Sequence, residues 1–428
     1  MKWSKLNSTQ FDVIVCGAGS AGIAAACSAA KAGAKTLILE KHAFSGGTVT
    51  AAMIHTLDAI KNCSDHQEEI VKGFASELIE EVNKLGGVVS KDNPGEALTI
   101  HPEVYKISID QILDERGVKT LYHAHVFDVI REGRKVTGVV VALKDGRANI
   151  YGDVVIDCTG DAEIAFYAGG EYDLDAHLQA LTCHFRLGNI PKGIGWEAWE
   201  QKLQAALNSE YEEGKIDVYG GPWVIRLNDF EISINGTRVF CNPIDPLELS
   251  MAEKKGRLQV YKIWKIIKRR VPELEQSYII ACGSQLHIRE SRKIVGEYTL
   301  NEENTKDGSA FFDGIAIGTW PVDIHPTDGF VGVHPHKDDP SPLYEIPYRC
   351  LVPISLDGLL VAGRPISTTH KAHGSTRVPG TSMATGQAAG VAAAMASRLG
   401  VEPRAIDVVE LQKNLRLQGA IVSNKDCL

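Results

Sequence analysis

The chain contains 428 residues, enough for two or three domains with separate hydrophobic cores. Hydrophobic residues make up 44% of the sequence and charged residues 23%, as in soluble globular proteins. The net charge of −9, without a basic run, argues against a nucleic-acid partner. No apolar run is long enough to span a bilayer and the N-terminus has no apolar signal region, so we expect no membrane partner and a cytoplasmic location. The nine scattered cysteines include no C-x-x-C pair, which predicts reduced thiols, no metal site and no redox dithiol.

The first predicted elements form a strand–helix–strand unit. Residues 11–16 are a short apolar run typical of a buried strand, a helix of small residues continues to about residue 32, and a second strand covers 35–39. Between the first strand and the helix the chain reads Gly-Ala-Gly-Ser-Ala-Gly over 17–22. Glu40 closes the second strand.

This G-x-G-x-x-G pattern predicts a dinucleotide site. Gly17 allows a tight turn, Gly19 lets backbone N–H groups approach a pyrophosphate at the helix N-terminus, and Gly22 lets helix and strand pack closely. Glu40 stands where a carboxylate accepts hydrogen bonds from ribose hydroxyls. The strand, turn, helix and terminal acid occur in the order that the fingerprint requires.

The following segments alternate between helix and sheet. Residues 67–85 carry an apolar face of helical period, and a second helix is expected over 101–117. Four strands should follow, over 120–126, 136–143, 147–151 and 154–157, with an Asp145-Gly146 hairpin turn between the second and third.

Residues 175–345 differ in character and contain five of the six tryptophans. Strands over 183–187, 223–227 and 239–242 with a long helix over 249–271 predict an α+β substrate domain built on an antiparallel sheet. It would be inserted into a first domain made of residues 1–174 and 346–428. The last segment contributes a strand at 359–364 and a helix at 381–399.

Two later motifs favour FAD over a nicotinamide cofactor. Residues 157–161, Asp-Cys-Thr-Gly-Asp, resemble the second motif of two-domain flavoproteins, and residues 360–364 with 382–390 resemble their last motif. In those proteins the last helix points its N-terminus at the flavin pyrimidine edge, where its dipole stabilises negative charge. Because the sequence has one G-x-G-x-x-G, a built-in NAD(P)H domain is not expected.

With these motifs the chain resembles the FAD-dependent oxidoreductase family of the glutathione-reductase-type flavoprotein superfamily. The matching pieces are GAGSAG at 17–22, SGGT at 45–48, DCTGD at 157–161, HIRESRKIVGEYTL at 287–300 and the segment 362–390. The resemblance implies an α/β fold with a Rossmann-type FAD-binding domain (parallel sheet plus β-meander) and FAD bound in extended form, its isoalloxazine at the domain interface. It does not imply a substrate.

The resemblance also implies the cofactor contacts. Thr48 could bond a phosphate or ribityl oxygen, and Val126 should touch adenine through its backbone. The full set comprises Gly17, Ala18, Gly19, Ser20, Ala21, Gly22, Glu40, Lys41, Gly46, Gly47, Thr48, Val126, Thr159, Gly160, Asp161, Gly363, Arg364, Arg377, Ala384, Gly386, Gln387 and Ala388.

Four side chains are candidates for the chemistry: Arg289, His55, His370 and His373. Arg289 would share a helix face with Arg292 and either clamp a substrate carboxylate, stabilise anionic flavin or belong to an ion-pair cluster. His370 and His373 are expected in a loop near the flavin, as a base, as hydrogen-bonded support or as a covalent attachment point. His55 could face the flavin from the opposite side.

These features predict an enzyme that moves a hydride between a small polar metabolite and flavin N5, oxidising an alcohol or amine carbon or reducing a C=C bond. The electron acceptor would be oxygen or a separate carrier. The alternative is a flavoprotein subunit, or FAD-dependent scaffold, that acts with a partner electron-transfer chain. The sequence is compatible with a homo-oligomer.

Overall fold

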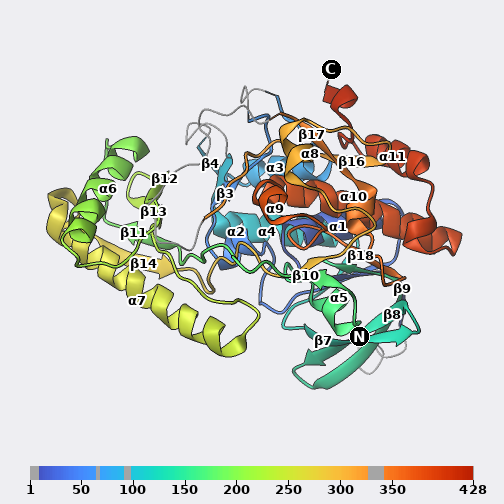
Figure 1. Ribbon diagram of the computed structural model, residues 1–428. Coiled ribbons are helices and arrows are strands. Elements are labelled where there is room, and N and C mark those ends of the chain that lie inside the picture. The colour runs from blue at the N-terminus through green and yellow to red at the C-terminus, as the bar shows by residue number, and fades with distance from the viewer. Residues whose placement is uncertain (1–8, 64–67, 91–97, 326–341, 428) are drawn as a thin grey trace.

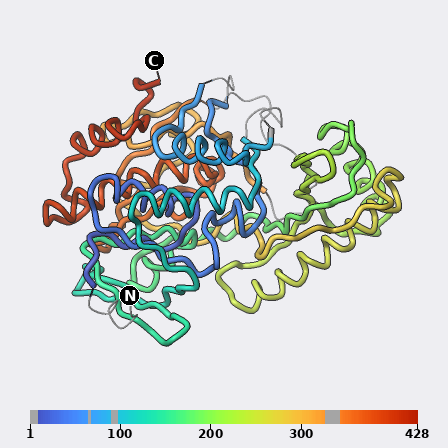
Figure 2. Tube along the Cα trace, turned by 180° about the vertical axis from the view of Figure 1, so that it is seen from behind, coloured from blue at the N-terminus to red at the C-terminus, as the bar shows by residue number. Residues whose placement is uncertain are grey.

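The computed structural model describes residues 9–63, 68–90, 98–325 and 342–427. Two bodies are visible in Figure 1: a larger one built around a mostly parallel sheet, and a smaller one that contains an antiparallel sheet and two long helices. Figure 2 shows from behind that the long helix and strands of the smaller body project to one side of the larger body.

The larger body is organised by a sheet in the order β6-β2-β1-β9-β8-β7, with β18 added beside β9. The strands β1, β2, β6 and β18 and the second half of β9 are parallel, whereas β7, β8 and the first half of β9 form an antiparallel meander. Their bounds are β1 Gln10–Cys16, β2 Thr36–Leu39, β6 Lys119–Leu121, β7 His125–Glu132, β8 Lys135–Leu143, β9 Gly146–Asp157 and β18 Leu359–Val361.

The sheet differs from the expected strands at β9 and at β6 and β7. The segments 147–151 and 154–157 were expected as separate strands but form one strand, because its first half pairs with β8 and its second half with β1. The expected strand 120–126 is instead divided into β6 and β7. A single strand therefore joins the meander to the parallel sheet.

Alternating side chains of β1 enter two different cores. Val13 and Val15 pack in the core that contains α1 (Ser20–Lys31) and α10 (Pro379–Leu399), while Ile14 packs toward the meander. The two helices approach closely at Gly386, which has no Cβ. A Cβ at this position would lie 2.1 Å from the backbone oxygen of Ala21. The parallel sheet is thus covered on both faces, which buries its strands completely.

The larger body contains further short strands and helices outside the main sheet. Helix α3 begins at Phe74 rather than near residue 67, which lies outside the described ranges, and its Phe74 N–H donates to Gln387 Oε1 at 3.1 Å. The remaining elements up to the smaller body are α2 Thr48–Ala51, β3 Thr56–Leu57, α3 Phe74–Lys84, β4 Val88–Ser90, β5 Leu98–Ile100, α4 Pro102–Glu115, α5 Glu163–Tyr167 and β10 Tyr172–Asp173.

The smaller body has a four-stranded antiparallel sheet in the order β12-β13-β11-β14. Its core includes the buried Trp199 and Phe185, and Asp245 caps its long helix by accepting from two backbone N–H groups. The expected strand 239–242 does not form, since Val239 makes an isolated bridge with Leu181. The elements are β11 Phe185–Gly188, α6 Trp196–Glu212, β12 Trp223–Asn228, β13 Glu231–Asn235, α7 Pro246–Arg270 and β14 Tyr278–Cys282.

The core of the smaller body is drawn from residues between Leu181 and Leu286. Leu300, Ile317 and Tyr344 belong instead to the core of the larger body, so part of the segment expected in the substrate domain packs with the parallel sheet. The later elements are β15 Lys293–Ile294, α8 Glu302–Lys306, β16 Gly314–Gly318, β17 Tyr344–Pro347, α9 His370–Thr376 and α11 Val408–Leu417. No helix within the described ranges is both long and apolar enough to cross a membrane.

Candidate cofactor and substrate site

A cavity of about 400 Å³ opens where the carboxyl ends of the parallel strands meet the smaller body. One end is lined by the loop after β1, by Glu40 and by the segment after β9. The other end is lined by the segment 285–289, by the first turn of α10 and by apolar residues such as Ile244 and Leu249 of the smaller body. Parallel α/β sheets bind ligands at this edge.

The three glycines of the fingerprint have different structural roles. A Cβ on Gly17, whose φ is +96°, would lie 2.5 Å from the Cys158 oxygen, and one on Gly22 would lie 1.8 Å from the Gly17 oxygen. A Cβ on Gly19 would approach Gly47 Cα at 3.8 Å, with no closer contact. Packing therefore requires Gly17 and Gly22, whereas Gly19 leaves free space at the wall of the cavity.

The N-terminus of α1 faces this space. Gly19 is the N-cap of the helix and no side chain caps its first turn. Ser20 and Ala21 also line the cavity. Backbone N–H groups and the positive end of the helix dipole are thus left for an anionic group such as a pyrophosphate.

Glu40 is buried in the cavity wall, and its carboxylate accepts hydrogen bonds from two backbone N–H groups of the protein. Its Oε2 accepts from the Ala18 N–H at 2.7 Å and its Oε1 from the His42 N–H at 2.8 Å. These bonds fix the carboxylate while each oxygen keeps a further lone pair. Lys41 and Val126 line the same end, with Val126 placed at the start of β7.

Hydrogen bonds to the Asp157 carboxylate fix the conformation of the loop after β9. This buried carboxylate accepts from the N–H and hydroxyl of Thr159 and from the N–H groups of Ile164 and Ala165 in α5. Burial raises the pKa of Asp157, and the four hydrogen bonds oppose that rise. The result presents Thr159, Gly160 and Asp161 to the cavity.

Glu163 is a titratable group at this end of the cavity that the sequence analysis did not single out. It lines the wall, and burial raises its pKa to about 7, with the positive charge of Lys41 opposing the shift. A carboxyl in this state changes charge near neutral pH.

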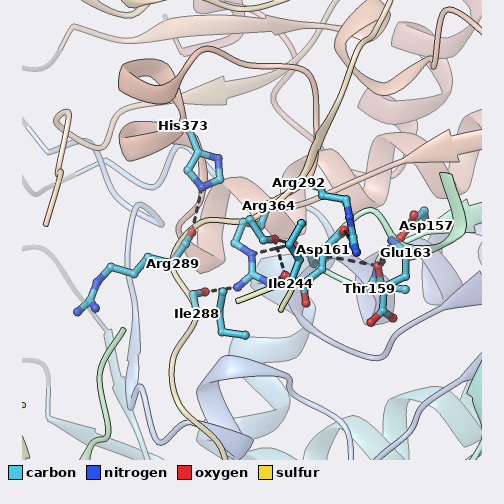
Figure 3. Close-up of polar contacts among 12 residues, drawn as sticks. Asp157, Thr159, Asp161, Glu163, Ile244, Ile288, Arg289, Arg292, Arg364 and His373 are labelled. Atoms are coloured by element: carbon cyan, nitrogen blue, oxygen red, sulfur yellow. Dashed lines mark hydrogen bonds and ion pairs between the residues drawn. The ribbon is translucent and has the colours of Figure 1, made fainter. Parts of the chain in front are cut away.

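Arg364 ties three segments together (Figure 3). Its Nε donates to the Gly160 oxygen at 2.8 Å, its Nη2 pairs with Asp161 at 2.5 Å, and its Nη1 donates to the Ile288 oxygen. Burial raises the pKa of Asp161, but the charge of Arg364 and a hydrogen bond from Ser291 outweigh it and lower the pKa. Arg364 therefore lines the cavity and also holds the segments at Gly160, Asp161 and Ile288 together.

The segment 287–292 is not helical: it runs from the isolated bridge of His287 with Thr182 to the start of β15, which corrects the expected shared face of Arg289 and Arg292. Residues three apart in an extended chain point to opposite sides. Arg292 stacks on Phe166 at 4.3 Å, while Arg289 runs away from the Asp161–Arg364 pair and donates to the Ala180 oxygen. Both arginines reach the cavity wall, from different directions.

Helix α10 approaches the cavity with its first turn, through Val378, Pro379 and Ser382. Four expected contacts lie farther along the helix and outside the wall: Ala384, Gly386, Gln387 and Ala388. Gly386 packs on α1 and Gln387 binds the N-terminus of α3, so these two residues serve helix packing. The expected contacts Ala18, Gly22 and Gly46 likewise lie behind the wall and support the loops that form it. The remaining expected contacts line it: Gly17, Gly19, Ser20, Ala21, Glu40, Lys41, Gly47, Thr48, Val126, Thr159, Gly160, Asp161, Gly363, Arg364 and Arg377.

Of the four candidates for chemistry, Arg289 alone lines the cavity. His370 and His373 lie on the short helix α9 rather than in a loop, and both hold the segment that carries Arg289. The His370 Nδ1 bonds Glu290 at 3.0 Å, which raises the pKa of His370. The His373 Nε2 bonds the Arg289 oxygen at 2.9 Å, and burial lowers the pKa of His373 to about 3.

His55 is fully buried behind the wall, and burial lowers its pKa to about 3. A histidine that does line the cavity, beside Arg289, is His287, which the sequence analysis did not select. Burial holds the pKa of His287 well below its usual value, so its ring is neutral at pH 7. An extended conformation would have revealed it, because residues 287 and 289 then face the same side.

Arg377 reaches the same end from α9. Its Nη2 pairs with Asp323 at 2.7 Å, and Asp323 also binds His325 Nε2 at 3.1 Å. Burial opposes ionisation of Asp323, but the hydrogen bond from His325 and the charge of Arg377 prevail and hold its pKa well below its usual range. Within the described ranges no group of three or more His, Cys, Asp or Glu side chains is arranged to hold a metal ion.

The chain belongs to the FAD dependent oxidoreductase family, whose model matches residues 12–415. It is 25% identical over 207 residues to digeranylgeranylglycerophospholipid reductase 1 of Methanococcoides burtonii, which covers 44% of this chain and 51% of that one. It is 31% identical over 174 residues to the tRNA uridine 5-carboxymethylaminomethyl modification enzyme MnmG of Alkaliphilus metalliredigens, covering 36% of this chain and 25% of the relative. The chain thus spans about half or less of the curated relatives it matches.

Solved structures share the fold. A geranylgeranyl bacteriochlorophyll reductase-like protein from Thermoplasma acidophilum has a TM-score of 0.51 at 14% identity, covering 95% of this chain and 83% of that one. A flavin-dependent brominase has a TM-score of 0.50 at 14% identity, with the same coverage.

The protein is therefore an enzyme of this family and its cofactor is FAD. The residues present fit that group: an uncapped helix N-terminus for the pyrophosphate, a gap at Gly19, and a fixed carboxylate at Glu40.

Proposed function

We propose that this enzyme transfers a hydride between a small polar metabolite and N5 of FAD. When bound, FAD supplies a two-electron acceptor or donor. The observation that carries the proposal is one continuous cavity that joins the dinucleotide cradle at Gly19 to a second end lined by His287, Arg289 and Arg377. A metabolite held at that second end would share the cavity with the cofactor.

The residues of that second end suit the binding of a polar substrate. His287 is neutral at pH 7, so its ring can hydrogen-bond a hydroxyl or amine of the substrate, whereas burial and the nearby arginine charges disfavour the protonated ring. Arg289 and Arg377 supply N–H donors that orient a polar substrate. Ile54, Ile244 and Leu249 add apolar surface that limits water.

Anaerobic mixing with a metabolite panel tests the proposal. The purified holoenzyme is mixed with alcohols and amines, and chemically reduced holoenzyme is mixed with compounds that contain an activated C=C bond. We expect one class to bleach, or restore, the visible flavin absorbance in a single turnover. Reoxidation by air, compared with reoxidation by a soluble carrier, then identifies the acceptor. If neither form reacts with any compound, the proposal is wrong.

A second candidate is a flavoprotein subunit that acts with a partner chain, and one surface favours it. Helix α7 exposes Leu247, Met251, Leu258 and Tyr261, with exposed fractions of 75%, 61%, 70% and 53%. A row of exposed apolar side chains along one helix suits contact with another protein. If the isolated chain is inert while a complex turns over, this candidate replaces the first.

A further inference from the structure

We propose that the substrate carries a carboxylate group and that Arg289 binds it. This inference rests on the proposed function, because it names the class of metabolite that enters the second end of the cavity. It follows from the hydrogen bonds, the burial and the charge around Arg289.

Arg289 is 3% exposed and its guanidinium is only partly satisfied by the protein. Its Nη1 donates to the Ala180 oxygen and to the Thr182 hydroxyl, both at 2.6 Å. Among the described residues, its Nε is buried without a hydrogen-bond partner, and the only hydrogen bonds of its guanidinium are those of Nη1. Nη1 is thus anchored, and the adjacent edge formed by Nε and Nη2 retains its donors. That edge is the fork that binds a carboxylate through two parallel bonds.

The charge of Arg289 is not neutralised by the described residues, in contrast to its neighbours. Arg364 pairs with Asp161, and Arg377 pairs with Asp323 at 2.7 Å, but Arg289 makes no ion pair with a described residue. The charged groups that most affect its pKa are two cations, Arg377 and Arg238, and one anion, Asp323. Burial is the largest effect and lowers the pKa of Arg289 to about 9, so the side chain is still cationic at pH 7.

A buried, unpaired cation is expensive unless an anion neutralises it. Asp323, the described acidic side chain that acts on Arg289, is already committed to Arg377 and His325. One uncompensated charge and one open fork match one carboxylate. His287, two residues away on the same side of the extended segment, lies in the same wall and is placed near a group next to that carboxylate.

Calorimetric titration of the FAD-loaded enzyme with acetate and with acetamide tests the inference, since the two probes have similar shape and differ in charge. We expect acetate to bind at least about tenfold more tightly than acetamide. In Arg289→Met the affinity for acetate should fall about 10- to 100-fold and the discrimination should disappear. Arg289→Lys should keep the preference with reduced affinity, because a lysine retains the charge but not the fork.

Arg226→Met is the matched control, because Arg226 lies on the smaller body and pairs with Asp229 near the surface. It should bind acetate as the unmodified enzyme does. FAD content and far-ultraviolet circular dichroism of each variant show that the fold and cofactor are retained; should Arg289→Met misfold, Arg289→Lys carries the test. Inorganic phosphate is titrated in parallel.

Equal binding of acetate and acetamide, tighter binding of phosphate than of acetate, or unchanged acetate affinity in both Arg289 variants would overturn the inference. Loss of FAD from both variants would also overturn it, because Arg289 would then serve the cofactor. These outcomes are separate from a failure of the proposed function, which is read from flavin bleaching. An enzyme that binds acetate through Arg289 but reacts with no metabolite supports the site and refutes the hydride transfer.

Discussion

His373 Nε2 lies 2.9 Å from the backbone oxygen of Arg289, and both residues are buried. The oxygen can only accept, so the ring donates from Nε2 and is fixed as one neutral tautomer. Helix α9 thus sets the backbone position of the arginine that faces the cavity, and His373 is a positioning residue.

Replacement of His373 tests this relationship. His373→Phe should lower the free energy of unfolding by about 1–3 kcal/mol, because it leaves a buried carbonyl without its donor. It should also weaken acetate binding. His373→Gln, whose amide can donate from a similar position, should recover part of both. Denaturant unfolding and calorimetry are the measurements, and equal behaviour of the two variants would refute a hydrogen-bonding role.

The glycine fingerprint predicts opposite phenotypes for two alanine variants. Gly19→Ala fits the protein, since its Cβ would meet Gly47 Cα at 3.8 Å, but it projects into the cofactor space. We expect the apoprotein to melt normally and FAD affinity to fall about tenfold or more. Gly22→Ala would place its Cβ 1.8 Å from the Gly17 oxygen and should destabilise the apoprotein itself. Thermal melts of apoprotein and flavin-fluorescence titration separate the effects, and normal FAD binding by Gly19→Ala contradicts the assignment.

The Arg364–Asp161 pair should behave as a coupled unit. Both side chains are largely buried, at 14% and 18% exposed, so removal of one partner leaves the other charge unpaired. Arg364→Met should cost about 3–5 kcal/mol of unfolding free energy. The double variant with Asp161→Asn should cost less than the sum of the two single changes. Urea unfolding of the four proteins measures the coupling, and simple additivity would show that the pair is not coupled.

Buried histidines should make the protein sensitive to acid. The pKa values of His55 and His373 are lowered to about 3 and that of His325 to about 4, in each case chiefly by burial. Below pH 6.5 the unfolded chain binds protons that the folded chain does not, so stability falls as pH falls, by up to about 1.4 kcal/mol per pH unit for each histidine. Glu163, with its pKa raised to about 7 by burial, acts in the opposite direction over pH 7 to 4.5. Burial also holds the pKa values of His184 and His287 well below the usual value, and both act in the same direction as the other histidines. The net loss between pH 6 and 5 should therefore exceed about 2 kcal/mol per pH unit.

His55→Leu provides the control for this profile. Removal of one buried histidine should reduce the slope by about 1.4 kcal/mol per pH unit. Unfolding by urea at several pH values gives both slopes. A stability that is flat from pH 6.5 to 5 would contradict the prediction.

Cys282 should be the most reactive thiol. Its hydrogen bond with Cys183 lowers the pKa of Cys282 to about 7, aided by the charge of Arg257, whereas the same contact raises the pKa of Cys183. Cys282 is also half-buried rather than enclosed. Alkylation with iodoacetamide near neutral pH, read by mass spectrometry, should label Cys282 first. In Cys183→Ala the pH midpoint of labelling should rise, and an unchanged midpoint would show that the contact does not activate the thiol.

The pair of cysteines also shows a limit of spacing arguments. The absence of C-x-x-C does not exclude contacts between thiols distant in the chain: Cys183, just before β11, and Cys282, at the end of β14, interact because the two strands are adjacent in the smaller sheet. The expected helix over Arg289 and Arg292 failed for a related reason. Short charged segments carry no strong period, and pairing with Thr182 on a neighbouring segment holds this one extended.

The candidate cofactor half of the site could be predicted from the sequence alone. Its turn at Gly17, its helix N-terminus at Gly19 and its acid at Glu40 lie within one strand–helix–strand unit, so local geometry fixes their relation. The tertiary structure alone decided the proposed substrate half, where Arg289 meets Ala180 and Thr182, and Arg377 meets Asp323. Those partners are distant in the chain, and their encounter depends on tertiary packing, which neither spacing nor periodicity encodes.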